Sequence, residues 1–157
     1  MQVNPIFMEK AIALATGNVT SGRGGPFGAV IVRDGKIVAT GANLVTATND
    51  PTAHGEIVAI RSACTALGRF QLTGCHIYSS CEPCPMCLAA IYWARCDAIF
   101  YGSSATDAAA AGFDDAFLYK EITRPINQRK IPAMILLREK ALTSFDAWRA
   151  QAGRIDY

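Results

Sequence analysis

A hairpin followed by strands that alternate with helices is the feature that most restricts the fold of this chain. The segment AVIVRDGKIVATG contains two apolar runs joined at Asp34-Gly35, a pair that favours the tight turn of a β-hairpin. Three further strands are expected at residues 76–80, 98–102 and 133–137. Helices are expected at residues 5–19, 52–67, 85–94 and 106–112, and an amphipathic helix closes the chain. This order predicts an α/β fold, a three-layer αβα sandwich in which helices cover both faces of a mixed sheet of about five strands.

The helices are expected to bury one face each. The inward residues predicted for 5–19 are Phe7, Ala11, Leu14 and Ala15, and those for 52–67 are Ile57, Ile60, Cys64 and Leu67. The last helix carries Phe145 and Trp148 on its apolar face, and Gly153 is expected to end it.

The composition suits a single domain over residues 1–157. Hydrophobic residues make up 51% of the chain, which argues against disorder, and no repeat or Gly/Ser linker divides it. No apolar run reaches the roughly 18 residues of a membrane helix, and the N-terminus lacks the basic leader of a signal peptide, so we expect a cytoplasmic protein. The net charge is only +2 and the basic residues are dispersed, which argues against a dedicated nucleic-acid binder.

Six cysteines in a chain with no secretory leader are more typical of metal ligands and buried thiols than of disulfides. Three of them, Cys81, Cys84 and Cys87, have the spacing C-x2-C-x2-C. Cys84 and Cys87 fall at the start of a helix that Pro85 opens, and their separation of three residues puts both sulfurs on one face. The free N–H groups of a helix start stabilise thiolates, so this pair predicts half of a zinc site.

The chain has only two histidines, His54 and His76, so the search for another ligand is short. His76 opens a strand, whereas His54 lies near the start of the 52–67 helix with Glu56 two residues further on. At a helix end, His54 can reach a metal while Glu56 approaches the same spot from another side. This layout of three protein ligands, one water and a nearby base is the one that a catalytic zinc needs.

Two arrangements of the cysteines are open. In a closed structural site, Cys81, Cys84, Cys87 and His54 fill all four positions of the zinc. In an open catalytic site, His54, Cys84 and Cys87 hold the metal, and Cys81 belongs to the core at the end of a strand. We favour the open site because Pro83 keeps the preceding residue extended and carries Cys81 away from the helix start. Glu82 is a rival to Glu56 as the base, ranked lower because it precedes a proline outside either helix.

The segments HGE and PCPMC together resemble the H-x-E…P-C-x-x-C signature of zinc-dependent nucleobase deaminases. Further segments resemble bacterial guanine deaminases across nearly the whole length: GGPFGAVIV, NDPTAHGE, SCEPCPMCLAAIYWAR, GFDDAFLYKE and the terminal DY. The resemblance implies a cytidine deaminase-like fold, a Zn²⁺ cofactor and the hydrolysis of guanine to xanthine and ammonia. It also implies a small-molecule nucleobase as substrate and a domain-swapped homodimer.

The resemblance also implies roles for single residues. Glu56 would shuttle protons, and Asp115 would belong to the catalytic site and hydrogen-bond the purine together with Asn43. Phe27 and Trp93 would sandwich the purine ring. Gly55 replaces the usual alanine of the family but keeps the backbone N–H that can face the base. Tyr157 would close the site of the partner subunit.

Other functions and simpler roles fit the same residues. A tRNA adenosine deaminase, a deaminase of cytosine or aminotriazine-type bases, and a non-catalytic domain held together by structural zinc are the alternatives. Phe27 and Trp93 could be ordinary core residues, and Asn43 could be a turn residue. Asp114 or Asp115 could cap a helix, and Tyr157 could belong to a frayed end.

Overall fold

The computed structural model describes residues 3–113 and 115–157. The chain divides into two compact units, residues 1–119 and residues 120–157. The first unit holds the sheet and the helices around it, and the second holds the C-terminal helices.

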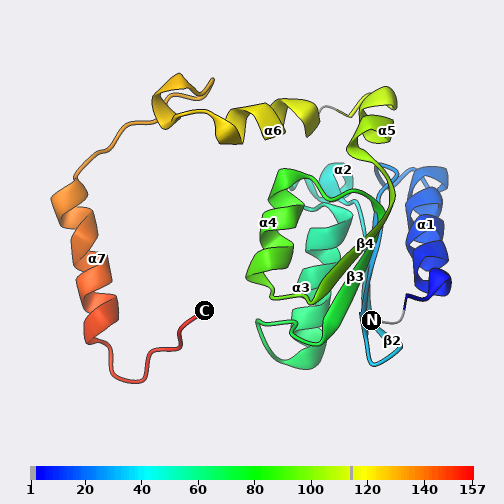
Figure 1. The fold of residues 1–157 in the computed structure, drawn as a ribbon, viewed down its shortest axis with the longest axis horizontal. Coiled ribbons are helices and arrows are strands. Elements are labelled where there is room, and N and C mark those ends of the chain that lie inside the picture. Colours follow the sequence, from blue (N-terminus) through cyan, green and yellow to red (C-terminus); the bar gives the residue numbers. More distant parts are fainter. Residues whose placement is uncertain (1–2, 114) are drawn as a thin grey trace. The chain divides into compact units, whose positions relative to one another are not determined.

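The sheet of the first unit is mixed and has four strands in the described residues, in the order β2-β1-β3-β4 (Figure 1). These strands are β1 (Gly28–Arg33), β2 (Lys36–Ala42), β3 (Cys75–Cys81) and β4 (Ala98–Ser103). β1 pairs antiparallel with both β2 and β3, and β3 pairs parallel with β4. The predicted hairpin is confirmed: Asp34 and Gly35 both adopt positive φ angles, 50° and 69°, as a tight two-residue turn requires.

Helices cover both faces of this sheet, as predicted (Figure 1). α1 lies on one face, and α3 and α4 lie on the other. Successive residues of β3 therefore enter different cores: Ile77 packs in the cluster under α3 and α4, and Tyr78 packs under α1. The helices are α1 (Pro5–Thr20), α2 (Val45–Thr48), α3 (Gly55–Leu67), α4 (Pro85–Trp93), α5 (Ala105–Ala110), α6 (Asp115–Thr123), the 3-10 turn η1 (Ile126–Gln128) and α7 (Arg138–Ala150).

The predicted inward residues of α3 do face the core, and two alanines beside them are buried more deeply. Ile57 is buried, and Ile60, Cys64 and Leu67 are half-buried and pack against the core under α3 and α4. Ala59 and Ala63 are fully enclosed. The reason is the close approach of α3 to β2. A Cβ on Gly41 would lie 2.2 Å from the carbonyl oxygen of Gly55 and 2.5 Å from the backbone nitrogen of Ala59. Only small residues fit between elements packed at this distance.

The predicted strand at residues 133–137 is wrong. The structure assigns no regular structure there, and Met134, Ile135 and Leu136 are more than 80% exposed. A strand forms by pairing with a neighbour, and the second unit contains no strand in its described residues. An apolar run with strand character thus remains unpaired.

The second unit also contains the end of α6, η1 and α7. Glu121 is buried, accepts hydrogen bonds from the Arg124 side chain (2.6 Å) and the Lys130 backbone N–H (2.7 Å), and so fixes the turn around η1. The last helix, α7, ends at Ala150 and not near Gly153 as expected. Its predicted apolar residue Phe145 is exposed.

All six cysteines are free thiols, as the clustered-thiol interpretation predicts. Among the described residues, no helix combines the length and the apolar character that a membrane crossing requires.

Candidate active site

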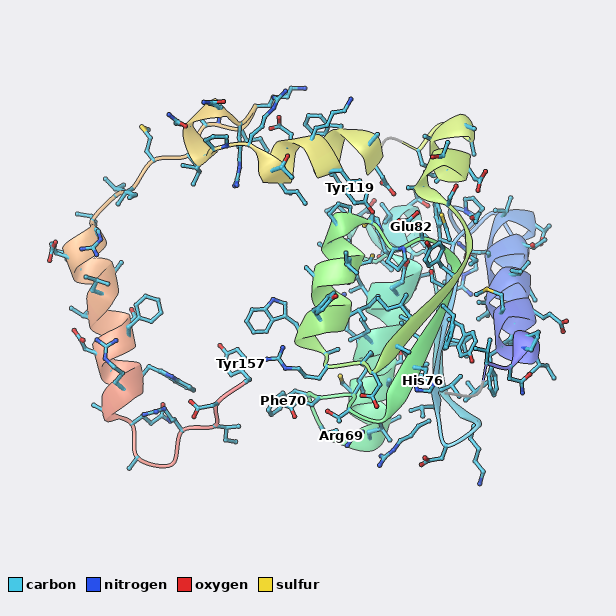
Figure 2. All side chains as sticks on the ribbon, in the orientation of Figure 1. Arg69, Phe70, His76, Glu82, Tyr119 and Tyr157 are labelled. Atoms are coloured by element: carbon cyan, nitrogen blue, oxygen red, sulfur yellow. The ribbon has the colours of Figure 1, made fainter. Side chains whose placement is uncertain are left out.

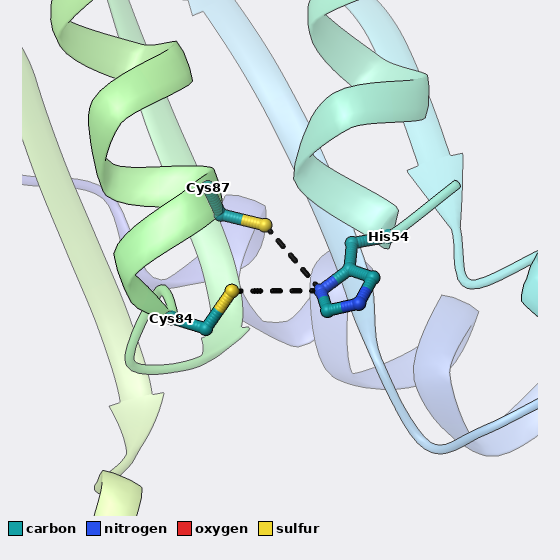
Figure 3. Close-up of side chains that lie close together, drawn as sticks. All are labelled: His54, Cys84 and Cys87. Carbon is teal, nitrogen blue, oxygen red and sulfur yellow. Dashed lines mark hydrogen bonds between the residues drawn. The ribbon is translucent and has the colours of Figure 1, made fainter. Parts of the chain in front are cut away.

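Two helix starts of the first unit bring the predicted metal ligands together (Figure 3). His54 precedes α3 and Cys84 precedes α4, both with extended backbone (ψ 157° and 167°), and Cys87 lies in the first turn of α4. α3 begins three residues later than predicted because residues 50–54 form a turn, in which the Asp50 side chain accepts a hydrogen bond from the Thr52 N–H (2.8 Å). Neither His54 nor Cys84 uses its side chain to cap its helix, so both side chains remain available as ligands.

The spacing of these three side chains fits a tetrahedral metal. The Nδ1 atom of His54 lies 3.7 Å from the sulfur of Cys84 and 3.5 Å from the sulfur of Cys87 (Figure 3). Two ligands at ordinary zinc–nitrogen and zinc–sulfur distances, separated by a tetrahedral angle, lie about 3.6 Å apart. Within the described residues, this is the one group of three His, Cys, Asp or Glu side chains whose ligand atoms lie within 4.8 Å of each other.

Hydrogen bonding within the group shifts the pKa values of its two thiols in opposite directions. A hydrogen bond from Cys87 lowers the pKa of Cys84 to about 4, and the same contact raises the pKa of Cys87. The hydrogen bond to Cys84 also raises the pKa of His54 above its usual value. Because a metal binds thiolates and neutral imidazole, zinc binding at this group must release protons.

Glu56 lies beside this group on the first turn of α3 and is only 5% exposed. Burial raises the pKa of its carboxyl group above the usual value. A hydrogen bond from the Ser79 hydroxyl to Oε1 (2.9 Å) partly opposes that shift. A carboxyl group with a raised pKa in a pocket is suited to accept and return a proton.

Cys81 lies outside the three-ligand group. Its thiol is buried and directed to the Ser104 carbonyl oxygen (3.7 Å), and burial raises its pKa. The open-site interpretation assigns Cys81 this role, that of an unreactive buried thiol at the end of a strand. The group therefore offers three ligand side chains, and a tetrahedral ion held by these three alone would have one position open.

A cavity of about 400 Å³ opens over this group. Its volume is within the range of small-molecule sites, about 300–1,000 Å³. Six residues singled out from the sequence as ligands, base or substrate contacts line it, namely Phe27, Asn43, His54, Glu56, Cys84 and Asp115.

Three other predicted contacts stand apart from the cavity lining. Gly55 is buried at the start of α3. A Cβ there would lie 3.2 Å from the carbonyl oxygen of Phe27, the residue before β1, so the glycine permits a close approach of α3 to the start of β1. Trp93, at the end of α4, is 62% exposed, which also rules out its interpretation as a core residue in this chain. Tyr157 belongs to the second unit, where its ring contacts that of Trp148.

Asn43 is held in place by its backbone. Its N–H donates to the Phe27 carbonyl (2.9 Å), and its own carbonyl accepts from the buried Asn18 side chain (2.8 Å). The Asn18 amide also donates to the Gly25 carbonyl (2.9 Å), and it therefore ties two walls of the cavity together. Asn18 was missed in the sequence, although a polar residue on the apolar face of α1 is a signal for such a bond.

Phe113 is a second lining residue that the sequence analysis missed. Its ring meets that of Phe27 edge to face at 4.7 Å, and its place directly before the FDD aspartates was the only signal. Asp115 is the first residue of α6, and Asp114 lies outside the described residues. Tyr119, a residue of α6 (Figure 2), donates a hydrogen bond to the carbonyl oxygen of Pro83 (3.2 Å), the residue before Cys84. The other lining residues are Gly25, Val45, Thr46 and Glu82.

Comparisons with known proteins agree with this geometry. Residues 1–103 match the cytidine and deoxycytidylate deaminase zinc-binding region. The guanine deaminase of Bacillus subtilis (strain 168) is 56% identical over 151 residues, which cover 96% of this chain and 97% of that protein. The crystal structure of guanine deaminase from Bacillus subtilis superposes with a TM-score of 0.96 and 54% identity over 99% of both chains. A tRNA-specific adenosine deaminase of Agrobacterium fabrum is 49% identical over 78 residues, half of each chain.

The match extends over more than half of the chain and includes both helix starts that carry the ligand group. The metal of that family is zinc, and the spacing of His54, Cys84 and Cys87 suits it. The chain therefore belongs to the zinc-binding cytidine and deoxycytidylate deaminase family.

Proposed function

We propose that this protein is a guanine deaminase, which hydrolyses guanine to xanthine and ammonia. The observation that carries the proposal is the presence of a three-ligand metal group and a buried carboxyl group in one cavity of small-molecule size, which Phe27, Asn43 and Asp115 also line. A structural zinc would need neither the open fourth position nor Glu56 in the cavity wall. The extent of the similarity to the Bacillus subtilis guanine deaminase supports guanine as the base.

In this proposal, His54, Cys84 and Cys87 hold the zinc, which supplies Lewis-acid activation of a water molecule when bound. Glu56 takes a proton from that water while the oxygen adds to the purine carbon that bears the amine. The carboxyl group would give this proton to a ring nitrogen, then take the proton of the newly added hydroxyl group and pass it to the departing amine, so that the oxygen becomes the carbonyl oxygen of the product. The carbon–nitrogen bond then breaks, and ammonia leaves. The raised pKa of Glu56 favours the uptake of the proton from water.

Recognition of the base falls to the other residues of the cavity. Phe27 offers an aromatic ring, and Phe113 supports it edge to face. The Oδ1 atom of Asn43 accepts the Val45 N–H (3.3 Å), which orients the amide and leaves Nδ2 to donate to the edge of a base. Asp115, as a carboxylate, can accept hydrogen bonds from the N–H groups of guanine. Trp93 and Tyr157 are proposed as further contacts when two chains assemble.

Ammonia release from a panel of free bases tests this substrate assignment. We expect the wild-type protein to prefer guanine over adenine and cytosine, and Asp115→Ala to lose guanine turnover by about 10²-fold or more, because buried hydrogen-bond acceptors discriminate strongly. Zinc content should stay at one ion per chain in the variant, since Asp115 lies outside the ligand group. A wild-type preference for an adenosine in an RNA hairpin over free guanine, in direct competition, would show that the substrate is wrong.

We further propose that two chains assemble with exchanged C-terminal segments. β4 is an edge strand with no neighbour on its outer side in the described sheet, and the apolar run at 133–137 lacks a strand partner. Exposed apolar side chains of this extent favour an interface between copies. In this proposal, residues 133–137 of one chain add a fifth strand to the sheet of the other, and its tail carries Tyr157 to the other cavity.

Deletion of residues 155–157 tests the exchange. The truncated protein should remain folded and zinc-loaded but turn over guanine much more slowly, because the cavity stays open to water. Truncated chains are then dissociated and reassociated with Glu56→Gln chains. In a heterodimer with exchanged tails, the truncated chain keeps Glu56 and receives the intact tail of its partner, so one of the two sites recovers. Absence of recovery in demonstrated heterodimers would contradict the exchange.

We also propose a cytoplasmic location. Six free thiols, two of them proposed zinc ligands, suit a reducing compartment.

A further inference from the structure

Ser79 is a buried polar residue of β3, and its side chain contacts Glu56, the proposed base. Along this face of the strand, Cys75 and Ile77 enter the apolar cluster under α3 and α4, and Ser79, two residues further, is 1% exposed. It pairs with Ala29 on one neighbouring strand and with Tyr101 on the other. A hydroxyl group enclosed in a sheet needs a hydrogen-bond partner, and Ser79 finds it in Glu56.

We infer that Ser79 is a positioning residue of the reaction, which holds the Glu56 carboxyl group in the orientation for proton transfer. The inference rests on the proposed function of Glu56. The bond from Ser79 Oγ to Glu56 Oε1 is 2.9 Å long and both side chains are at most 5% exposed, so water does not compete for it. It joins the centre of the sheet to the first turn of α3.

The chemistry of the neighbours explains why this one bond matters. Cys87, one of the proposed zinc ligands, is the other side chain that lies close enough to Glu56 to influence its carboxyl group. As a zinc ligand, Cys87 is a thiolate and has no proton to donate. Ser79 is then the remaining side-chain donor to the carboxyl group.

A hydroxyl donor suits both states of the base. Ser79 donates to Oε1, so the proton can be taken up and returned on the second oxygen, Oε2. Ser79 donates to Oε1 before the proton arrives and continues to donate to it afterwards, because a protonated carboxyl group keeps an acceptor oxygen. The carboxyl group therefore keeps its orientation through the proton cycle, which is the role of a supporting residue in a preorganised site.

The test compares Ser79→Ala, Ser79→Thr and a control, Ser103→Ala. Ser103 is another strand serine, but its hydroxyl donates to the Ser80 carbonyl and not to Glu56. We expect Ser79→Ala to lower kcat about 10–100-fold, the usual loss when a supporting hydrogen bond of a metal site is removed. KM for guanine and the zinc content should stay near the wild-type values. Ser79→Thr should restore most of kcat, and Ser103→Ala should match the wild type.

A double variant separates positioning from a general effect on the fold. If Ser79 acts through Glu56, adding Ser79→Ala to Glu56→Gln should reduce the residual rate by less than about twofold, since coupled residues are non-additive. Calorimetric binding of guanine to Glu56→Gln should be equal with and without Ser79→Ala.

Three results would overturn the inference. The first is a kcat of Ser79→Ala within about twofold of wild type, and the second is a loss of zinc in Ser79→Ala. The third is that Ser79→Ala lowers the rate by the same factor in the Glu56→Gln variant as in the wild type. Failure of the proposed function has a different signature. In that case, Glu56→Gln alone keeps its turnover, or wild type releases no ammonia from guanine, whatever happens at Ser79.

Discussion

Glu56→Gln is expected to lower guanine turnover by about 10²–10⁴-fold, the usual contribution of a general acid–base residue. The glutamine has the shape of the original side chain and can still accept the Ser79 hydrogen bond, so the packing of the site is kept. It cannot take up and return a proton. Guanine binding and one zinc ion per chain should therefore be retained, which equilibrium binding and metal analysis of the purified variant can measure.

Glu82→Gln is the matched control, because Glu82 is the second glutamate that lines the cavity. Its Oε2 atom accepts the Ala105 N–H (3.0 Å) and so holds the start of α5, a bond that glutamine can replace. Turnover of Glu82→Gln should stay within about tenfold of wild type. The reverse result, a large loss for Glu82→Gln and a small one for Glu56→Gln, would identify Glu82 as the base.

The ligand group could be predicted from the sequence because short-range geometry determines it. A proline that opens a helix directly after Cys84 fixes the position of Cys84 and Cys87, and the only histidine near another helix start is His54. Each half of the site follows from a few consecutive residues. What remained open was whether two helix starts far apart in sequence would meet, and the packing of α3 and α4 on one face of the sheet brings them together.

The parts that sequence reasoning missed depend on tertiary packing or on pairing with another segment. The apolar run at 133–137 has the composition of a strand, yet a strand needs an edge to pair with, and composition does not show which chain supplies that edge. The deep enclosure of Ala59, beside the predicted inward residues of α3, depends on the close approach of α3 to β2 that Gly41 allows. The role of Ser79 depends on a contact with Glu56, 23 residues away in sequence, that no local pattern records.

Cys87→Ala is expected to remove zinc and to abolish turnover, whereas Cys81→Ala is expected to retain one zinc ion per chain. The two variants make the same change at thiols six residues apart in sequence, and both thiols are at most 5% exposed. Cys87 lies 3.5 Å from Nδ1 of His54, and removing it leaves two protein ligands, too few to hold zinc tightly. Cys81 contributes a weak hydrogen bond to the Ser104 carbonyl oxygen and some packing.

Metal analysis after gel filtration, with circular dichroism to show that both variants fold, measures the difference. If each of the two single variants, Cys81→Ala and Cys87→Ala, loses zinc, all three cysteines bind one ion and close the site. A closed ion has no position for water, and the role of Glu56 would then fail with it. Zinc retained in Cys81→Ala but lost in Cys87→Ala leaves the fourth position open beside a buried carboxyl group, and an open position next to a proton carrier is what hydrolysis requires.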